Sequence, residues 1–312
     1  MNKFFSIINK LKKSNLDFRT IKEIEEIKIL KGKILSELQN LNDSNNLNDR
    51  EFKVFSQFGE DGIINFLVKK TRIKDDEKFF VEIGVGDYSE CNTKFLLMND
   101  FWTGVAIEGN KESANHIKDK EICWKYGLKV ISEWVRKDNI KSLIEKNVSN
   151  NKIGLLSLDI DGNDYWILNE IKNIKPIIII VEWNSLFGSK KSVTTPYDDN
   201  FVREKKHFSG QYWGASIKAF HDLMKSRGYF LVGSNMAGNN LFFVREDRKN
   251  DLIEKKTSEA FQKQIFKDSR DENGKLNFLD NREKLKVIEN LDVFDLEEKK
   301  MIKISELVEN ER

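Results

Sequence analysis

Proline, cysteine and histidine are scarce in this sequence of 312 residues, which contains two prolines, two cysteines and three histidines. The cysteines, Cys91 and Cys123, are too few for a disulfide framework and lack the spacing of a metal site, so a reducing cytoplasm is expected. Long apolar runs are missing as well. The longest, Ile177 to Val181, is far shorter than the roughly 20 residues that cross a bilayer, so no transmembrane segment is expected.

A large charge of one sign is also absent, because the net charge is only +2. This balance gives no reason to expect nucleic acid or an anionic membrane as the main partner. Apolar residues make up 39% of the chain and charged residues 33%, so the protein can bury a core beneath a heavily charged surface. The length suggests one large domain or about two ordinary ones.

Short apolar runs alternate with helical patterns through the middle of the chain. Strands are expected at residues 79–82, 104–108, 128–131, 153–159, 177–182, 228–232 and 241–245. Helical segments separate the first six, an order typical of a doubly wound α/β domain with a parallel sheet. The last two strands, joined across SNMAGNN, predict a hairpin that places an antiparallel strand at the sheet edge.

The stretch FFVEIGVGDYS, residues 79–89, predicts the first strand and a tight turn against a nucleotide. Gly84 and Gly86 can adopt positive φ and allow close approach of backbone N–H groups to a ligand. A dinucleotide motif would require a third glycine, but Ser89 follows instead. Glu82 would repel a pyrophosphate and suits the cationic methionine end of S-adenosylmethionine, so the pattern favours the methyl donor.

Two further positions complete the expected cofactor site. Glu108 ends the second strand, where a carboxylate accepts hydrogen bonds from ribose hydroxyls. A solvated acid at a strand end is the alternative. The loop that contains Glu133 and Trp134 follows the third strand, where an indole could stack on adenine or pack as core.

Acids follow the fourth and fifth strands. Asp159, Asp161 and Asp164 come at and after one strand end, and Glu182 and Asn184 at the next. The carboxyl ends of parallel strands meet, so these groups should share a cleft and raise one another's pKa. Such groups bind a cation, accept a proton or bind hydroxyl-rich ligands. A turn and helix cap is the alternative for residues 161–164.

The insertion at residues 184–211 is too long for an ordinary connection and is predicted to act as a lid. It contains His207, which is a candidate general base for a hydroxyl group or, alternatively, a surface histidine. Asp159 and Asp161 are the other candidate catalytic residues, because either could position or deprotonate an acceptor.

The blocks SQFGEDGI, FFVEIGVGDYSECNT, GVAIEGN, LLSLDIDGNDYWIL, IIIIVEWN, QYWGASIKAF and GYFLVGSNMAGNNLFFVR together resemble the FkbM-related S-adenosylmethionine-dependent methyltransferases. The resemblance covers Phe55 to Arg245. It implies a seven-stranded Rossmann-like sheet whose last strand is antiparallel, and O-methylation of a sugar or glycan-related molecule in polysaccharide biosynthesis. It also implies cofactor contacts from Gln57, Glu82, Gly84, Gly86, Glu108, residues 132–134 and Asp159.

Catechol-type and macrocin-type O-methyltransferases hold Mg²⁺ at these strand ends. By that analogy Asp159, Glu182 and Asn184 are candidate metal ligands, and direct hydrogen bonding to the acceptor is the competing use. Two other functions stay open. One is a nicotinamide-dependent oxidoreductase, and the other is a non-catalytic scaffold with a vestigial pocket.

We expect three parts: a helical N-terminal extension with a linker at 1–50, a methyltransferase domain at 51–249 and a charged helical C-terminal extension at 250–312 without further strands. The N-terminal helix is expected to pack on the domain or to pair with another subunit. The alternative is a membrane-surface anchor formed by Phe4, Phe5 and Lys10 to Lys13.

Overall fold

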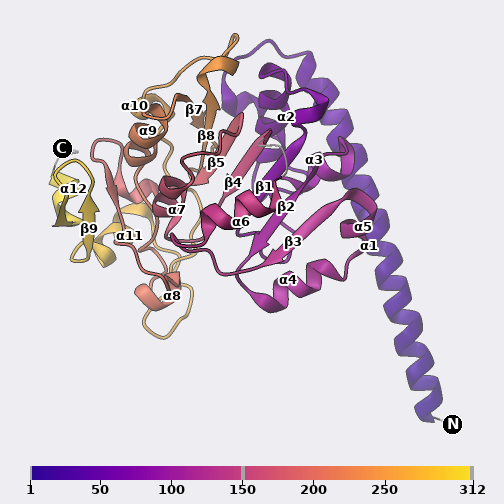
Figure 1. Cartoon of the computed structure of the whole chain (residues 1–312). Coiled ribbons are helices and arrows are strands. Elements are labelled where there is room, and N and C mark those ends of the chain that lie inside the picture. The colour runs from indigo at the N-terminus through magenta and orange to yellow at the C-terminus, as the bar shows by residue number, and fades with distance from the viewer. Residues whose placement is uncertain (1, 149–151, 310–312) are drawn as a thin grey trace.

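The computed structural model describes residues 2–148 and 152–309, with side chains for 20–148 and 152–307. Its centre is a seven-stranded sheet in the order β3-β2-β1-β4-β5-β8-β7 (Figure 1). The strands are β1 Phe79–Ile83, β2 Thr103–Glu108, β3 Leu128–Ser132, β4 Leu155–Leu158, β5 Ile178–Glu182, β7 Tyr229–Ser234 and β8 Asn240–Arg245. This is the class I methyltransferase sheet, and it confirms the predicted fold class.

Strand β8 differs in position from the prediction. It runs antiparallel to both neighbours and lies between β5 and β7, so the expectation that the antiparallel strand forms the edge was wrong. The edge strand is β7. Burial does not distinguish the two strands, because residues 229–234 of β7 and 240–244 of β8 are all buried.

Alternate side chains of the central strands enter two separate cores, as the two-residue period of a strand requires. Val81, Leu156 and Ile179 belong to one core, and Phe80 and Leu155 to the other. Side chains of α6 Ile140–Asn147, α7 Asp164–Glu170, α9 Ile217–Lys225 and α10 Thr257–Ala260 fill the first. Side chains of α2 Glu60–Lys70, α3 Lys94–Asn99, α4 Lys111–Lys118 and α5 Glu121–Tyr126 fill the second.

A second, three-stranded sheet joins the insertion to the C-terminal segment. Its order is β10-β9-β6, with β6 Val193–Thr194, β9 Asp292–Asp295 and β10 Lys300–Lys303. The expectation that residues 250–312 contain no strand was therefore wrong. The helices of these two regions are α8 Arg203–Lys206, α11 Asn281–Ile288 and α12 Ser305–Glu309. Val193, Ile288 and Val293 share a small core here, so the C-terminal segment is packed rather than a loose appendage.

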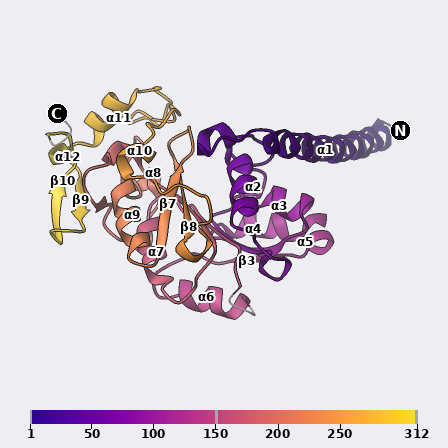
Figure 2. The same cartoon turned by 90° about the horizontal axis from the view of Figure 1, so that it is seen from above.

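The N-terminal helix α1, Asn2–Asn40, lies beside α2 and α3 with its C-terminal part and projects beyond the body with the rest (Figures 1 and 2). The expected linker that follows is partly ordered against the domain, because Leu47 and Arg50 are buried in the 3-10 helix η1, Leu47–Arg50. The other 3-10 helices are η2 Asp75–Glu77, η3 Ser185–Phe187 and η4 Glu246–Arg248.

Within the described residues, none of the helices has a stretch long and apolar enough to span a bilayer. The proposed anchor residues Phe4, Phe5 and Lys10 to Lys13 lie outside the described side chains, as do Met1 and residues 310–312. The division into three parts at residues 50 and 250 stays a prediction.

Candidate functional site

The turn after β1 has the backbone that its two glycines predict. Gly84 has φ +82° and Gly86 has φ +54°. A Cβ atom on Gly84 would lie 1.6 Å from the carbonyl oxygen of Asp159, so the end of β4 approaches too closely for any other residue. A Cβ on Gly86 would meet nothing within 4 Å. One glycine therefore permits packing of the strand ends, and the other borders open space.

Glu108 ties the end of β2 to this turn. Its Oε2 accepts a hydrogen bond from the backbone N–H of Gly86 at 2.7 Å, and its Oε1 accepts one from Asn110 N–H at 2.7 Å. Strands β1 and β2 pair in parallel with Ile83 opposite Ile107, which brings the turn and the acid together. Each carboxylate oxygen retains a second lone pair, so Glu108 can still accept bonds from a ligand's hydroxyl groups.

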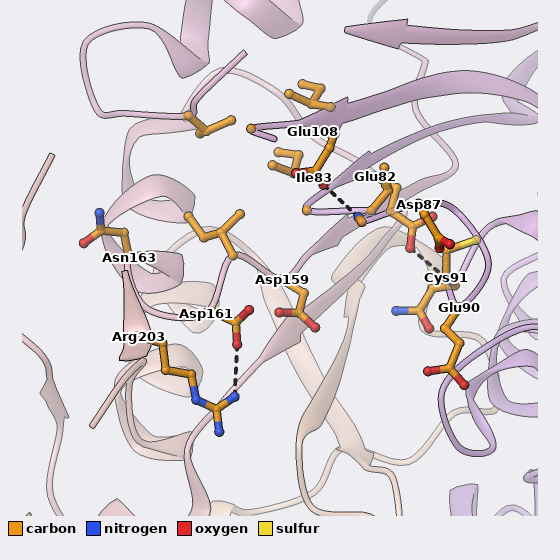
Figure 3. A pocket seen from close by; sticks show the side chains of 18 of the residues that line it. Glu82, Ile83, Asp87, Glu90, Cys91, Glu108, Asp159, Asp161, Asn163 and Arg203 are labelled. Carbon is orange, nitrogen blue, oxygen red and sulfur yellow. Dashed lines mark hydrogen bonds and ion pairs between the residues drawn. The ribbon is translucent and has the colours of Figure 1, made fainter. Parts of the chain in front are cut away.

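A cavity of about 580 Å³ lies over the turn at the carboxyl ends of β1, β2 and β4. This volume is in the range of small-molecule sites. The lining includes seven acids, which are Glu82, Asp87, Glu90, Glu108, Asp159, Asp161 and Glu204. Among the described residues that line it, Arg203 is the one basic side chain. Figure 3 shows Asp159 and Asp161 on one side of the cavity, with Glu82 and Glu108 across from them.

Glu82 lines the cavity, but its oxygens are bound internally. The carboxylate accepts hydrogen bonds from Asn92 N–H at 2.7 Å, from Thr93 N–H at 3.1 Å and from the Thr93 hydroxyl. Burial raises its pKa to about 7, although these hydrogen bonds oppose the shift. Because Asn92 and Thr93 directly precede α3, the Glu82 carboxylate occupies the place at the helix start where a dinucleotide motif seats its pyrophosphate.

The three remaining predicted cofactor positions are Gln57, Glu133 and Trp134. Gln57 and Trp134 line the cavity, whereas Glu133 does not. The indole ring of Trp134 lies against Gly109, just beyond Glu108, where a Cβ on Gly109 would be 2.7 Å from the ring. Its Nε1–H donates to the carbonyl of Asp199 at 2.8 Å, and the residue remains 40% exposed. The ring is therefore held in place while still accessible to a ligand.

Asp159, Asp161 and Glu182 form an acidic group whose oxygens lie within 4.8 Å of one another. Glu182 is buried behind the half-buried Asp159, and Asp161 is exposed. Burial, followed by repulsion from the neighbouring acids, raises the pKa of both Asp159 and Glu182 well above the usual range. One carboxyl oxygen of Glu182 is buried without a hydrogen-bond partner in the described part of the chain. These two groups are therefore suited to share one proton or to face a cation.

Arg203, from α8 in the insertion, lines the cavity and was not predicted from the sequence. Its guanidinium group contacts Asp161 at 3.0 Å and Asp268 at 2.7 Å, and also donates to the carbonyl of Gly210. Figure 3 shows the ion pair with Asp161 at the edge of the cavity. The basic run REKK gave no sign that this one side chain turns inward. Arg203 supplies positive charge beside the acidic group without any bound ion.

His207 and Asn184 are not brought to the cavity. His207 contacts the hydroxyl of Ser209 through Nδ1 at 2.8 Å, and desolvation lowers its pKa. The buried amide of Asn184 donates to the carbonyls of Gln211 and Trp213 and accepts from Leu186 N–H, so it organises the insertion. This bonding explains why the two candidates sit apart from the acidic group.

Asp164 has the structural role that the sequence left as an alternative. Its two carboxylate oxygens accept hydrogen bonds from Ile160 N–H and Gly162 N–H, each at 2.9 Å. This closes the loop after β4, in which Asp161 has φ +56°. Asp164 is fully buried, and burial raises its pKa to about 7. The loop thus presents Asp159 and Asp161 to the cavity while Asp164 holds its shape.

No known family model matches the sequence, and no curated protein matches it. Solved structures do resemble the chain. The N-terminal domain of EvdMO1, solved with SAH bound, is 10% identical over 61% of this chain and 80% of its own, with a TM-score of 0.40. An O-methyltransferase from Bacillus cereus in complex with SAH is 14% identical over 70% of this chain and 91% of its own, with a TM-score of 0.39.

A third similar structure, an S-adenosylmethionine-dependent methyltransferase from Clostridium acetobutylicum, is 12% identical over 58% of this chain and 90% of its own, with a TM-score of 0.34. The likenesses are distant, and none of them points to the FkbM family. The fold assignment depends on the strand order of the sheet and not on these similarities.

Proposed function

We propose that this chain is an S-adenosylmethionine-dependent methyltransferase that acts on a hydroxyl group of an uncharged or cationic acceptor, with a sugar as the favoured class. The observation that carries the proposal is an acid-lined cavity directly over the glycine turn, with Glu108 bound to that turn. Gly86 and Glu108 would hold the ribose end, and Trp134 would stack on the adenine. These roles fit the geometry of a nucleoside bound at the carboxyl ends of β1 and β2.

The same cavity argues against the nicotinamide alternative. A diphosphate would face seven acids and one arginine, and Glu82 already fills the start of α3. Binding a diphosphate there would bring like charges together in a poorly solvated space. A sulfonium cation would instead be attracted by these acids. The charge excess also disfavours nucleotide sugars, other anionic acceptors and nucleic acid.

The scaffold alternative predicts a plugged cavity, but the volume of about 580 Å³ is open to a ligand. The relation to FkbM-type enzymes of polysaccharide biosynthesis stays a proposal supported by the order of the sequence blocks. A cytoplasmic location is proposed in the same way, and the two free cysteines support a reducing compartment.

The chemistry would be a direct displacement, for which the bound sulfonium supplies an electrophilic methyl group. The acceptor oxygen would bond to the methyl carbon as the carbon–sulfur bond breaks, with the bond electrons left on sulfur. The hydroxyl proton would pass to Asp159. Its raised pKa would make Asp159 a stronger base than an ordinary aspartate, and the positive charge of Arg203 lies nearby. Alignment of donor and acceptor supplies much of the rate enhancement.

Calorimetric titration with S-adenosylhomocysteine tests the cofactor. We expect binding of S-adenosylhomocysteine and none of NADH at the same concentration. Glu108→Ala should weaken binding at least tenfold, because it removes the ribose acceptor and frees the turn. Glu112→Ala, an exposed acid on the adjacent helix, is the matched control and should bind normally. Undiminished binding by the Glu108 variant would refute the ribose contact.

Mg²⁺ held by Asp159, Asp161 and Glu182 is a second candidate feature of the site. The unpartnered buried oxygen of Glu182 favours it, and Arg203 offers an internal alternative to a metal. Asn184, a ligand in the original prediction, has its amide engaged by backbone groups. Calorimetry with Mg²⁺ and activity in chelator test this proposal. Heat of binding and a loss of activity that Mg²⁺ restores would support it, and indifference to both would remove it.

A further inference from the structure

Helix α1 has one face fixed to the domain. Gly32 and Ser36 are buried in this contact, and a Cβ on Gly32 would lie 2.5 Å from the ring of Phe95. Gln39 donates to the carbonyls of Arg50 and Gly62, and Glu25 forms an ion pair with Lys94 at 2.6 Å. These contacts fix the rotation of the helix, so its opposite face must point away from the body.

That opposite face carries an apolar stripe in full contact with solvent. Ile27, Leu30, Ile34, Leu38 and Leu41 are between 53% and 81% exposed. At 100° per residue, all five fall within about 80° around the helix, on the side opposite Gly32 and Ser36. No described residue of the chain covers them. A surface helix normally turns such a stripe toward a core.

We infer that this stripe is the contact surface for a second copy of the chain, with the two α1 helices side by side. Ile27, Ile34 and Leu41 recur every seven residues, with Leu30 between the first two. Ile27, Leu30 and Ile34 have the a/d spacing of a coiled coil, whereas Leu41 directly follows the end of α1. The two domains would then lie on opposite sides of the pair, because each α1 holds its own domain on the far face.

Charges beside the stripe suit pairing with a second copy. Glu26 and Lys31 flank it on opposite sides and are five residues apart, the spacing at which one helix bridges to the other in a parallel pair. An antiparallel pair centred on Ile34 would set Ile27 against the partner's Leu41, Leu30 against the partner's Leu38 and Lys31 against the partner's Glu37, so the stripe can face a second copy in either direction. Lys31 now donates to the carbonyl of Lys53 at 3.1 Å and is exposed, so it remains within reach of a partner.

The same acids argue against a membrane as the occupant. Glu23, Glu26 and Glu37 lie on or beside the stripe and are exposed. An interfacial helix that binds anionic lipid carries basic residues in those places. Glu23 and Glu37 also fall at d positions of the heptad, where they weaken the seam. The dimer should therefore be a modest one, with a dissociation constant on the order of micromolar.

Sedimentation velocity on the full chain, from about 1 to 100 µM, measures the association. We expect the mass to rise with concentration from 36.6 kDa toward twice that value. Ile34→Glu should weaken dimerisation at least tenfold. Ile21→Glu is the matched control, because Ile21 is exposed to a similar degree, 58% against 53%, but lies off the stripe. Circular dichroism spectra should show both variants folded.

Cysteine crosslinking tests the direction. Under mild oxidation, Ile34→Cys should form a disulfide with its own copy, because position 34 faces itself in both directions, and the natural sequence, with Cys91 and Cys123 alone, is the control. Ile27→Cys should crosslink with its own copy in a parallel pair, and only with Leu41→Cys in an antiparallel one. A chain in which none of these crosslinks forms would overturn the proposal. A wild-type chain that stays monomeric over the whole concentration range would also overturn it. Flotation of the wild-type chain with phosphatidylserine vesicles, lost in Ile34→Glu, would overturn it as well.

Discussion

The contrast between Gly84 and Gly86 allows the packing role of a glycine to be separated from its ligand role. Gly84→Ala would place a Cβ 1.6 Å from the Asp159 carbonyl oxygen at a positive φ. We expect it to lower the free energy of unfolding by roughly 2–5 kcal/mol, from strain plus overpacking. Urea unfolding measures this loss.

Gly86→Ala is the matched control, because its Cβ would enter open space and meet only the backbone cost of about 1 kcal/mol. It should unfold almost like the wild type but bind S-adenosylhomocysteine more weakly, since the added methyl group faces the cavity. Equal destabilisation by both substitutions would contradict the role given to the Asp159 carbonyl.

Asp164 gives a pH-dependent stability term whose sign follows from its burial. Its pKa rises from 3.8 to about 7 in the folded chain, so between these values the folded chain keeps a proton that the unfolded chain has lost. The free energy of unfolding is therefore higher below about pH 4 and falls as the pH rises to about 7. At about 1.4 kcal/mol per pKa unit, the fall is on the order of 4 kcal/mol.

Urea unfolding of the wild type and of Asp164→Asn, across this pH range, isolates the contribution. The amide does not titrate, so the variant should show a shallower decline with pH. It retains one side-chain oxygen for Ile160 N–H or Gly162 N–H. Parallel curves for the two proteins would show that Asp164 is ionised throughout. Glu82, with a pKa of about 7 among Asn92, Thr93 and the nearby Asp61, adds to the slope in both.

At the scale of elements, helix α8 acts on the site through Arg203. Replacing Arg203 with leucine removes the positive charge that opposes the raised pKa of Asp159 and Glu182. If Asp159 takes the proton of the acceptor's hydroxyl group as proposed, the acid limb of the pH–rate profile should move to higher pH by about one unit. The rate at neutral pH should then fall. Arg203→Lys should restore much of the original profile.

A full profile of kcat against pH checks this expectation. A uniform loss of rate in Arg203→Leu, with no movement of the acid limb, would show that Arg203 only supports the shape of the insertion. Lys206→Leu, a change in the same short helix, is the control, because Lys206 pairs with Asp198 and does not line the cavity.

The elements divide into those that sequence patterns could locate and those that they could not. Strands such as β5 were predictable, because a run of β-branched residues bounded by polar ones has few other uses. Strand β6 spans two residues, and β9 and β10 read DVFD and KMIK, too short and too charged for a periodicity signal. The position of β8 was missed because a hairpin sequence does not reveal which of its strands inserts into the sheet.

The residues around the cavity also divide into those that the sequence could place and those that it could not. Gly84, Gly86, Glu108, Trp134, Asp159 and Asp161 were predictable, because strand ends of one parallel sheet must meet. Arg203 was not, since its place depends on the folding of a long insertion. His207 was chosen for its chemistry alone, and the packing of residues 207–209 turned it toward Ser209 instead.

At the scale of the whole molecule, the C-terminal segment supports the part of the cavity that contains Arg203. Lys284 of α11 donates to the carbonyl of Phe266 at 2.6 Å and lies 3.5 Å from Asp268, which holds Arg203. Strand β9 pairs with β6 of the insertion. The part of the cavity at the glycine turn, by contrast, is built by β1, β2 and β4. The two halves of the site should therefore respond differently when the segment is removed.

Deleting residues 281–312 tests this division. We expect S-adenosylhomocysteine affinity to stay within about threefold, while methyl transfer falls more than tenfold because Arg203 and the insertion lose their support. If the deletion does not fold, Lys284→Met gives the same comparison with the small core intact. Loss of cofactor binding in a folded Lys284→Met protein would mean that the two halves are coupled. Unchanged turnover would mean that Asp268 holds Arg203 without help from α11, and that the C-terminal segment serves stability alone.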